Sequence, residues 1–269
     1  MKKIAPQRCR IAGNKPLDRA GRYFRLTIEG FHSPRKIDPG QFVHVKTGDG
    51  YDPYFRRAFS IAGFDASSGR MELIHKVVGR GTNLLARKAK GETLDLIGPL
   101  GNRFILPGKS VTTIIVAGGV GLPPLAFLAR RLVDKGYDPE QVFFFYGSRS
   151  RDDLIDMARI RRLGVRFIPC TDDGSYGRKG FVTQAVNDHL ARLDGNRLFI
   201  YGCGPEPMLA ALQNLALDKR LKGELSLEAP MPCGVGVCLG CVKPSLADPG
   251  RYVRVCYDGP VFKIGEVQL

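Results

Sequence analysis

The sequence predicts a β-barrel domain, then an α/β domain with a doubly wound parallel sheet, then a small C-terminal segment organised by cysteines. Three changes of pattern along the chain indicate this order. Short alternating stretches of apolar and polar residues run from Arg22 to about Pro107, and strand–helix alternation replaces them from about Val111. After about Lys222 the chain is rich in glycine, proline and cysteine. We therefore expect three domains, at residues 1–107, 108–222 and 223–269.

The expected strands differ in character between the first two segments. In the first, turn residues separate the stretches RYFRLTI, QFVHVK, AFSIAG, MELIHKVV and TLDLIGP, which is typical of an antiparallel sheet or small barrel. In the second, the continuous apolar runs VTTIIVA, QVFFFY, VRFI and RLFIY are typical of buried parallel strands. Between the first two of these runs, Leu125, Leu128 and Leu132 fall on one face of a predicted helix.

The chain of 269 residues has a net charge of +15 and a pI near 9.7. Its basic residues are scattered, in runs no longer than pairs such as Arg56-Arg57, and no nucleic-acid-binding motif accompanies them. We therefore expect phosphorylated small molecules or an acidic partner, and not nucleic acid. No apolar run approaches the roughly 18–20 residues of a membrane span, and the start lacks the apolar region of a signal peptide. These features predict a cytoplasmic protein, in which clustered cysteines indicate a metal or redox site.

Four of the seven cysteines follow the spacing Cys233-x4-Cys238-x2-Cys241-x14-Cys256. Three cysteines in one loop and a fourth from later in the chain is the spacing of plant-type [2Fe–2S] proteins. Structural zinc sites instead pair two close Cys-x2–4-Cys knuckles. The glycines between these cysteines allow the backbone to wrap tightly and to direct N–H groups at the sulfurs. We expect a [2Fe–2S] cluster, with a zinc ribbon or inert thiols as the alternatives.

Two motifs in the barrel segment are suited to a phosphate-bearing ligand. In Arg57-Ala58-Phe59-Ser60, the arginine can reach a diphosphate while the serine approaches a ring edge. In Gly79-Arg80-Gly81-Thr82, glycines leave backbone N–H groups free at the start of a helical turn. Each motif alone is weak, and the alternative is an exposed arginine beside a core strand and an ordinary glycine turn. Their occurrence together in one small barrel favours a ligand.

The α/β segment opens with a glycine-rich loop after its first strand. Gly118, Gly119 and Gly121 precede a helix, in a G-x-G-x-x-P pattern that ends at Pro124 and departs from the strict dinucleotide fingerprint. Further on, the stretch from Gly202 to Pro205 lies where another buried strand ends. Ligands of open α/β sheets bind at the carboxyl ends of the strands. Two such loops favour a nucleotide site over a purely structural turn.

The order of these motifs resembles the ferredoxin–NADP reductase superfamily, in which a flavin barrel precedes a nicotinamide domain. The stretches CGVGVCLGC and VCYDGPVF resemble, more specifically, the electron-transfer subunits of dihydroorotate dehydrogenase B, as does TDDGSYGRKGFVT. The resemblance covers nearly the whole chain. It implies an FAD-binding β-barrel domain, an NAD-binding Rossmann-like domain and a small C-terminal [2Fe–2S] domain.

The resemblance also implies which residues bind each cofactor. The residues implied for FAD are Arg57, Ala58, Phe59, Ser60, Ile74, His75, Lys76, Gly81 and Thr82. The residues implied for NAD, an exchangeable substrate, are Gly118, Gly119, Gly121 and Cys203. The implied cluster ligands are Cys233, Cys238, Cys241 and Cys256. No residue of this chain is expected to act as a base on dihydroorotate.

The residues alone do not separate NAD from NADP. The strand QVFFFY leads into Gly147-Ser148-Arg149, with no acidic residue to hold a ribose 2′-hydroxyl group. Arg149 could instead favour a 2′-phosphate group. NAD is therefore implied by the resemblance and not by this strand end.

The chemistry of the cofactors predicts the order in which electrons pass. Nicotinamide exchanges a hydride and an iron–sulfur cluster takes one electron, so a flavin, which does both, must lie between them. The resemblance implies an FMN-containing dihydroorotate dehydrogenase catalytic subunit as partner, in pyrimidine (UMP) biosynthesis, and a heterotetramer with two subunits of each kind. We expect the cluster loop to lie at the interface with this partner.

The alternative function is that of relatives with the same modules that serve other partners. This chain would then be the NAD(P)H-oxidising flavin and iron–sulfur subunit of an anaerobic sulfite reductase, a sulfide dehydrogenase or a ferredoxin:NADP oxidoreductase. Some of these relatives replace the first cluster cysteine with aspartate, and Cys233 disfavours them. A zinc-stabilised regulatory module with degenerate nucleotide loops is the alternative outside redox proteins.

Overall fold

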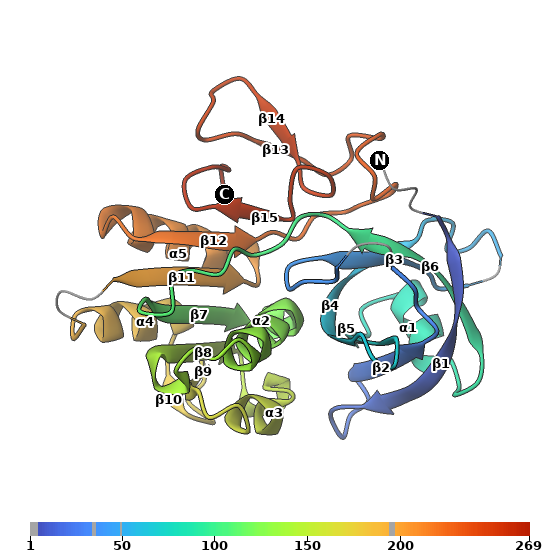
Figure 1. The fold of residues 1–269 in the computed structure, drawn as a ribbon, viewed down its shortest axis with the longest axis horizontal. Coiled ribbons are helices and arrows are strands. Elements are labelled where there is room, and N and C mark those ends of the chain that lie inside the picture. Colours follow the sequence, from blue (N-terminus) through green and yellow to red (C-terminus); the bar gives the residue numbers. More distant parts are fainter. Residues whose placement is uncertain (1–4, 34–35, 49, 194–196) are drawn as a thin grey trace.

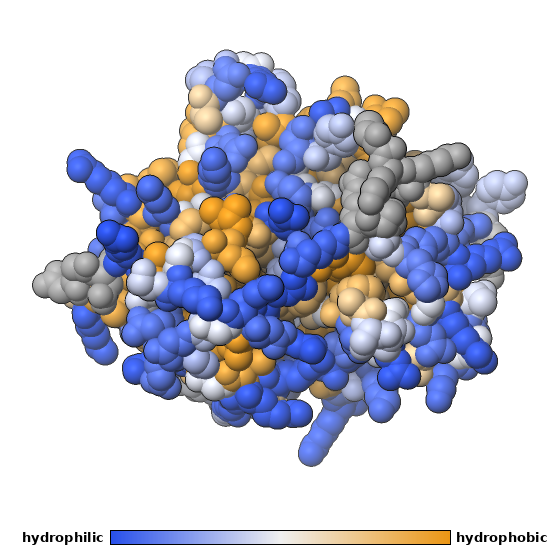
Figure 2. Space-filling view, viewed as in Figure 1, coloured by the Kyte–Doolittle hydropathy of each residue, from blue (hydrophilic) through white to orange (hydrophobic). Residues whose placement is uncertain are grey.

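The computed structural model describes residues 5–33, 36–48, 50–193 and 197–269. The barrel and the α/β domain lie side by side, and the C-terminal segment lies along one edge of both (Figure 1). On the face shown in Figure 2, hydrophilic side chains cover most of the surface, and apolar surface is visible in the hollow between the two larger domains. The predicted fold class is confirmed.

Six antiparallel strands form the closed barrel, in the order β1-β2-β5-β4-β3-β6. Its elements are β1 (Gln7–Pro16), β2 (Tyr23–Glu29), β3 (Phe42–Lys46), β4 (Arg57–Asp65), β5 (Arg70–Lys76), α1 (Arg80–Arg87) and β6 (Thr93–Leu100). Side chains that alternate along these strands fill the interior, among them Ile11, Leu26, Val43 and Leu96. The alternating pattern of the sequence is therefore the pattern of a barrel with one buried face.

The α/β domain is a seven-stranded sheet in the order β10-β9-β8-β7-β11-β12-β15. Its strands are β7 (Thr112–Gly118), β8 (Val142–Ser148), β9 (Arg166–Thr171), β10 (Arg178–Lys179), β11 (Leu198–Cys203), β12 (Lys222–Ser226) and β15 (Val261–Lys263). All neighbours are parallel except β15, which runs antiparallel to β12. The chain builds outward from β7 in both directions, so the strand order reverses between β7 and β11, where such sheets bind ligands.

Helices cover both faces of this sheet. They are η1 (Gly119–Gly121), α2 (Leu122–Asp134), η2 (Pro139–Gln141), η3 (Arg151–Asp153), α3 (Met157–Arg161), α4 (Val182–Leu190) and α5 (Glu206–Asp218). The predicted apolar face of α2 is confirmed, since Leu125, Leu128 and Leu132 are fully buried. Helices α2 and α3 pack on one face of the sheet, and α4 and α5 pack on the other. None of the helices in the described part of the chain is both long and apolar enough to cross a membrane.

Partly buried polar contacts join the barrel to the α/β domain. Arg131 on α2 forms an ion pair with Asp38 of the barrel at 2.5 Å, and Tyr23 of β2 donates a hydrogen bond to Asp153 at 2.9 Å. The segment that connects the two domains is attached to the α/β sheet as well, because the Ile105 N–H group donates a hydrogen bond to Glu224 on β12 at 2.9 Å. These contacts fix the two domains against each other around the space between them.

The C-terminal segment is attached to the α/β sheet as well as to the barrel. Its strand β15 pairs with β12, with Phe262 opposite Leu225, and a short hairpin, β13 (Val242–Pro244) with β14 (Tyr252–Arg254), stands above it. The Asn102 side chain, in the connection that follows the barrel, donates to the Val261 carbonyl group at 2.7 Å. A segment too small for its own core is therefore stabilised by its neighbours.

Candidate functional site

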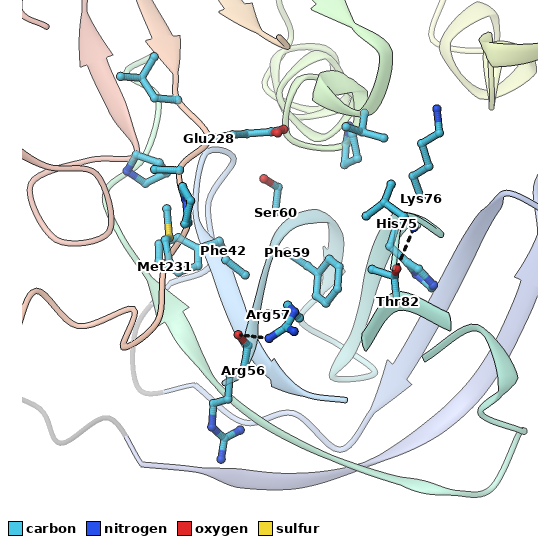
Figure 3. A pocket seen from close by; sticks show the side chains of 18 of the residues that line it. Phe42, Arg56, Arg57, Phe59, Ser60, His75, Lys76, Thr82, Glu228 and Met231 are labelled. Atoms are coloured by element: carbon cyan, nitrogen blue, oxygen red, sulfur yellow. Dashed lines mark hydrogen bonds between the residues drawn. The ribbon is translucent and has the colours of Figure 1, made fainter. Parts of the chain in front are cut away.

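A pocket of about 530 Å³ lies where the barrel, the loop after β7 and the segment after β12 meet (Figure 3). Residues from three separate parts of the chain line it. Eight residues predicted for FAD are among them: Arg57, Ala58, Phe59, Ser60, Ile74, His75, Lys76 and Thr82. All four residues of the first barrel motif, and Thr82 of the second, thus face one cavity, whereas Gly81 does not line it.

One corner of the pocket is suited to an anion. Arg57 donates to the Phe55 carbonyl group at 2.6 Å and makes no ion pair with any described residue. A Cβ atom on Gly81 would lie 3.1 Å from Thr47 Oγ1 and 3.2 Å from Arg57 Nε, so glycine lets the start of α1 approach both groups. Thr47 Oγ1 is buried without a hydrogen-bond partner among the described residues. A guanidinium group without an ion pair, a hydroxyl group without a partner and the N–H groups at the start of α1 fit a diphosphate.

Aromatic side chains form another wall of the pocket. The rings of Phe59 and His75 are 5.8 Å apart, and Phe24 stacks on the other side of His75 at 5.7 Å. Burial lowers the pKa of His75 to about 4, which keeps the imidazole neutral near pH 7. Both ring nitrogens are buried without a partner among the described residues. A flat heterocycle with polar edge atoms fits such a wall better than an aliphatic ligand does.

The residues predicted for NAD lie together, but behind the pocket wall. Strands β7 and β11 pair so that Ala117 lies opposite Cys203, and a Cβ atom on Gly121 would lie 2.1 Å from the Cys203 carbonyl oxygen. Cys203 is buried, and that burial raises the pKa of its thiol. The pocket is lined at this point by Val120 and Pro123. Packing against Cys203 therefore requires glycine at position 121. The roles toward NAD of Gly118, Gly119, Gly121 and Cys203 stay predictions.

Glu228 is a pocket residue that the sequence analysis missed. It lies two residues after β12, and its side chain extends into the pocket across from Ser60 (Figure 3). The residue is accessible from the pocket, yet the surrounding protein desolvates the carboxyl group and raises its pKa. Its position at the carboxyl end of a strand beside β11 was the signal that could have identified it.

The four predicted cluster cysteines lie in two pairs. The Cys238 N–H group donates to Cys233 Sγ at 3.5 Å, and the Cys256 N–H group donates to Cys241 Sγ at 3.4 Å. Within the described residues, no three His, Cys, Asp or Glu side chains converge as a single metal ion would require. Two pairs are nevertheless the grouping that a two-iron cluster uses, since its four cysteines are shared between two irons.

The loop around these cysteines is built to present N–H groups to sulfur. Val235 and Gly240 also donate, to Cys233 Sγ at 3.5 Å and to Cys238 Sγ at 3.4 Å. Burial opposes ionisation of Cys233, but hydrogen bonds from the backbone of Val235 and from Cys238 lower its pKa to about 6 and so favour the thiolate that a metal binds. Burial raises the pKa of Cys256 to about 12, so a metal must displace that proton. The donor set fits a [2Fe–2S] cluster.

Comparisons with known proteins match all three parts of the chain. Residues 8–105 match an oxidoreductase FAD-binding domain, and residues 115–214 match an oxidoreductase NAD-binding domain. Residues 228–268 match the iron–sulfur cluster binding domain of dihydroorotate dehydrogenase B. A chain from a structure of an NADH-dependent reduced ferredoxin–NADP oxidoreductase is 28% identical with a TM-score of 0.81, covering 100% of this chain and 91% of its own. A ferredoxin–NADP+ reductase from Neisseria gonorrhoeae shares the fold at 17% identity and a TM-score of 0.68, covering 80% of this chain and 92% of its own.

The fold and the site thus define a flavin- and nicotinamide-binding oxidoreductase with an appended iron–sulfur domain. The dihydroorotate dehydrogenase B (NAD(+)) electron transfer subunit of Bacillus velezensis is 39% identical over 254 residues, which are 93% of this chain and 94% of that subunit. The subunit of the same name from a Geobacillus species is 39% identical over 261 residues, covering 96% and 97%. The chain belongs to the family of dihydroorotate dehydrogenase B electron transfer subunits.

Proposed function

We propose that this chain passes electrons between NAD and an FMN-containing dihydroorotate dehydrogenase catalytic subunit, in the step of UMP biosynthesis that forms orotate. The observation that carries the proposal is the path of the segment after β12. Residues 226–232 line the same pocket as the Arg57–Ser60 motif, and Cys233, the first cluster cysteine, follows them immediately in the chain. The pocket and the cluster loop are therefore neighbours in the structure.

FAD in this pocket would supply the change from two-electron to one-electron transfer. Arg57, Thr47 and the first turn of α1 would hold its diphosphate, with Gly81 allowing their close approach. Phe59 and His75, with Ala58, Ile74 and Lys76, would form the wall beside the rings. Ser60 faces the pocket from the barrel, and Glu228 faces it from the end of β12 in the α/β domain.

NAD would enter at the edge of the sheet where β7 and β11 end. Of the three glycines there, only Gly119 has open space at its Cβ position, while Val120 and Pro123 face the flavin pocket. Arg149 at the end of β8 has acidic neighbours, since Asp172 and Asp173 continue the adjacent strand and their N–H groups bond to the carbonyl groups of residues 148 and 149. The positive field of Arg149 reaches Asp172, where it opposes the rise in pKa caused by burial. This acidic pair supports NAD over NADP.

The cluster loop would face the partner subunit. Around the cysteines, Val237 is 79% exposed and Leu239 is 58% exposed, and Val235 and Tyr257 are also exposed. Apolar side chains at such exposure are suited to burial in a protein–protein interface. We infer that two such chains bind two catalytic subunits in a heterotetramer. The cytoplasmic location stays a prediction from the sequence.

The proposal is tested by assembling the chain with the dihydroorotate dehydrogenase catalytic subunit from its own source and measuring dihydroorotate-dependent NAD reduction. The Cys238→Ser variant should keep its FAD absorption and flavin reduction by NADH but lose the cluster's electron paramagnetic resonance (EPR) signal and at least 100-fold of the coupled activity. The Cys9→Ser variant is the control, because Cys9 is buried in the barrel. Normal coupled activity in Cys238→Ser would refute the proposed route.

A different electron acceptor is the second candidate, favoured by the similarity over the whole chain to the NADH-dependent reduced ferredoxin–NADP oxidoreductase. The two candidates differ in the assembled complex. If NADH reduces both FAD and the cluster but dihydroorotate does not reduce NAD, the second candidate is supported.

A further inference from the structure

His44 lies between the flavin pocket and the cluster loop. It is on β3, opposite Ala58 of β4, and two residues from Phe42. Phe42 and Ala58 both line the pocket, and residues two apart on a strand or directly opposite across a pair share one face. The His44 side chain therefore lies on the pocket face of the barrel wall, with its ring 6.2 Å from that of Phe42. His44 does not itself line the pocket, because another part of the chain covers its side chain and leaves it only 1% exposed.

The cover is the segment that runs from the pocket to the first cluster cysteine. The imidazole makes a polar contact with the backbone of Met231, which lines the pocket. A Cβ atom on Gly234 would lie 2.8 Å from both Nδ1 and Cε1 of His44, so the ring packs directly on the Gly234 backbone. Gly234 has a φ of +70°, a conformation that favours glycine. One buried ring thus contacts this segment on both sides of Pro232 and Cys233.

The other ring nitrogen of His44 makes no polar contact in the described part of the chain that would explain a histidine at this position. Its Nε2 atom is buried without a partner among the described residues, and an unpaired buried nitrogen is a cost that an apolar ring of similar size would avoid. Histidine therefore does more than fill space at this position. The polar contact with the Met231 backbone is one that phenylalanine could not make, and the packing of the ring on Gly234 places this polar group against the loop.

We propose that His44 is a positioning residue that fixes the cluster loop against the flavin pocket and so sets the separation of the two redox groups and the surroundings of the Cys233 sulfur. This inference rests on the proposed function, because it assigns His44 a role in transfer from flavin to cluster. Backbone groups around a cluster's sulfurs tune its potential, and a loop held by close packing on a buried ring keeps them in place.

The test compares His44→Ala, His44→Gln and His44→Phe with the wild-type protein, all loaded with FAD and cluster. Stopped-flow mixing with NADH separates flavin reduction from the subsequent reduction of the cluster. We expect flavin reduction to stay within twofold in every variant, and cluster reduction to slow at least tenfold in His44→Ala and His44→Phe. His44→Gln, which can still donate to the backbone, should recover most of that loss. His189→Phe, on α4 away from the pocket, is the control for loss of a histidine.

Two further readouts separate positioning from simple loss of structure. The EPR spectrum and the midpoint potential of the cluster should shift in His44→Phe at full iron and FAD content. Gly234→Ala perturbs the same contact from the loop side, and its slowing of cluster reduction should not add to that of His44→Ala. The Gly234→Ala variant keeps the test decisive if His44→Ala fails to fold.

The proposal is overturned if His44→Phe and Gly234→Ala both keep the wild-type rate of cluster reduction and the wild-type EPR spectrum. A wild-type protein in which NADH reduces the flavin and never the cluster would overturn the proposed function itself. The two failures are therefore distinguishable.

Discussion

Glu224 gives a prediction about stability that depends on pH. This carboxyl group lies on β12 and is 5% exposed, and its Oε2 atom accepts the Ile105 N–H group at the connection between the barrel and the α/β domain. Burial raises its pKa from the usual 4.5 to about 7. Replacing it by glutamine keeps an oxygen acceptor for Ile105 and removes the charge.

The magnitude follows from the two pKa values. Below pH 4.5 the group is protonated in both the folded and the unfolded chain, so its burial adds no charge penalty. Between pH 4.5 and 7 the unfolded chain loses the proton while the folded protein retains it, so stability falls as the pH rises. At about 1.4 kcal/mol per pH unit, the wild-type protein loses about 3 kcal/mol across this window. Glu224→Gln should therefore be more stable than the wild type by about 3 kcal/mol at pH 8, and by less than about 1 kcal/mol at pH 5.

The assay is urea unfolding of both proteins, loaded with their cofactors, at pH 5, 6, 7 and 8. The difference between variant and wild type cancels the titration of all other groups. The matched control is Glu140→Gln, because Glu140 is 63% exposed and its ion pair with Arg166 lies at the surface. A difference between Glu224→Gln and wild type that stays constant from pH 5 to pH 8 would refute the reasoning.

Two further predictions use neighbouring residues as controls. Arg57→Ala should weaken FAD binding about 10- to 100-fold, because a charged hydrogen bond to phosphate contributes about 1.5–3 kcal/mol; Arg56→Ala should change it less than threefold, since Asp95 already pairs with Arg56 at 3.0 Å. Fluorescence titration of the apoprotein with FAD measures both, and equal effects would contradict the assigned diphosphate corner. Asp38→Ala should destabilise the protein by about 3 kcal/mol because it leaves the largely buried Arg131 unpaired. Asp134→Ala, which breaks an exposed pair on the same helix, should change stability by less than about 1 kcal/mol in the same urea experiment.

Local patterns in the sequence were sufficient for the cluster motif, the barrel and the parallel sheet. Each of these features depends on residues that are close together in the chain: the cysteine spacing, the alternating strands and the buried apolar runs. They can therefore be recognised from the sequence without a structure. The barrel motifs around Arg57 and Gly81 were found for the same reason. They converge on one corner, with the Gly81 backbone beside the Arg57 side chain.

The tertiary structure alone decided which distant residues meet. Thr47, Glu228 and His44 belong to no motif, and their roles depend on contacts with segments far away in the chain. Pairing of β15 with β12 likewise draws the cluster segment onto the α/β sheet. Such contacts come from closing long loops around shared apolar surface, and no short stretch of sequence encodes them. The sequence by itself determined what chemistry this protein contains, and the tertiary structure decided how its parts are placed for electrons to pass.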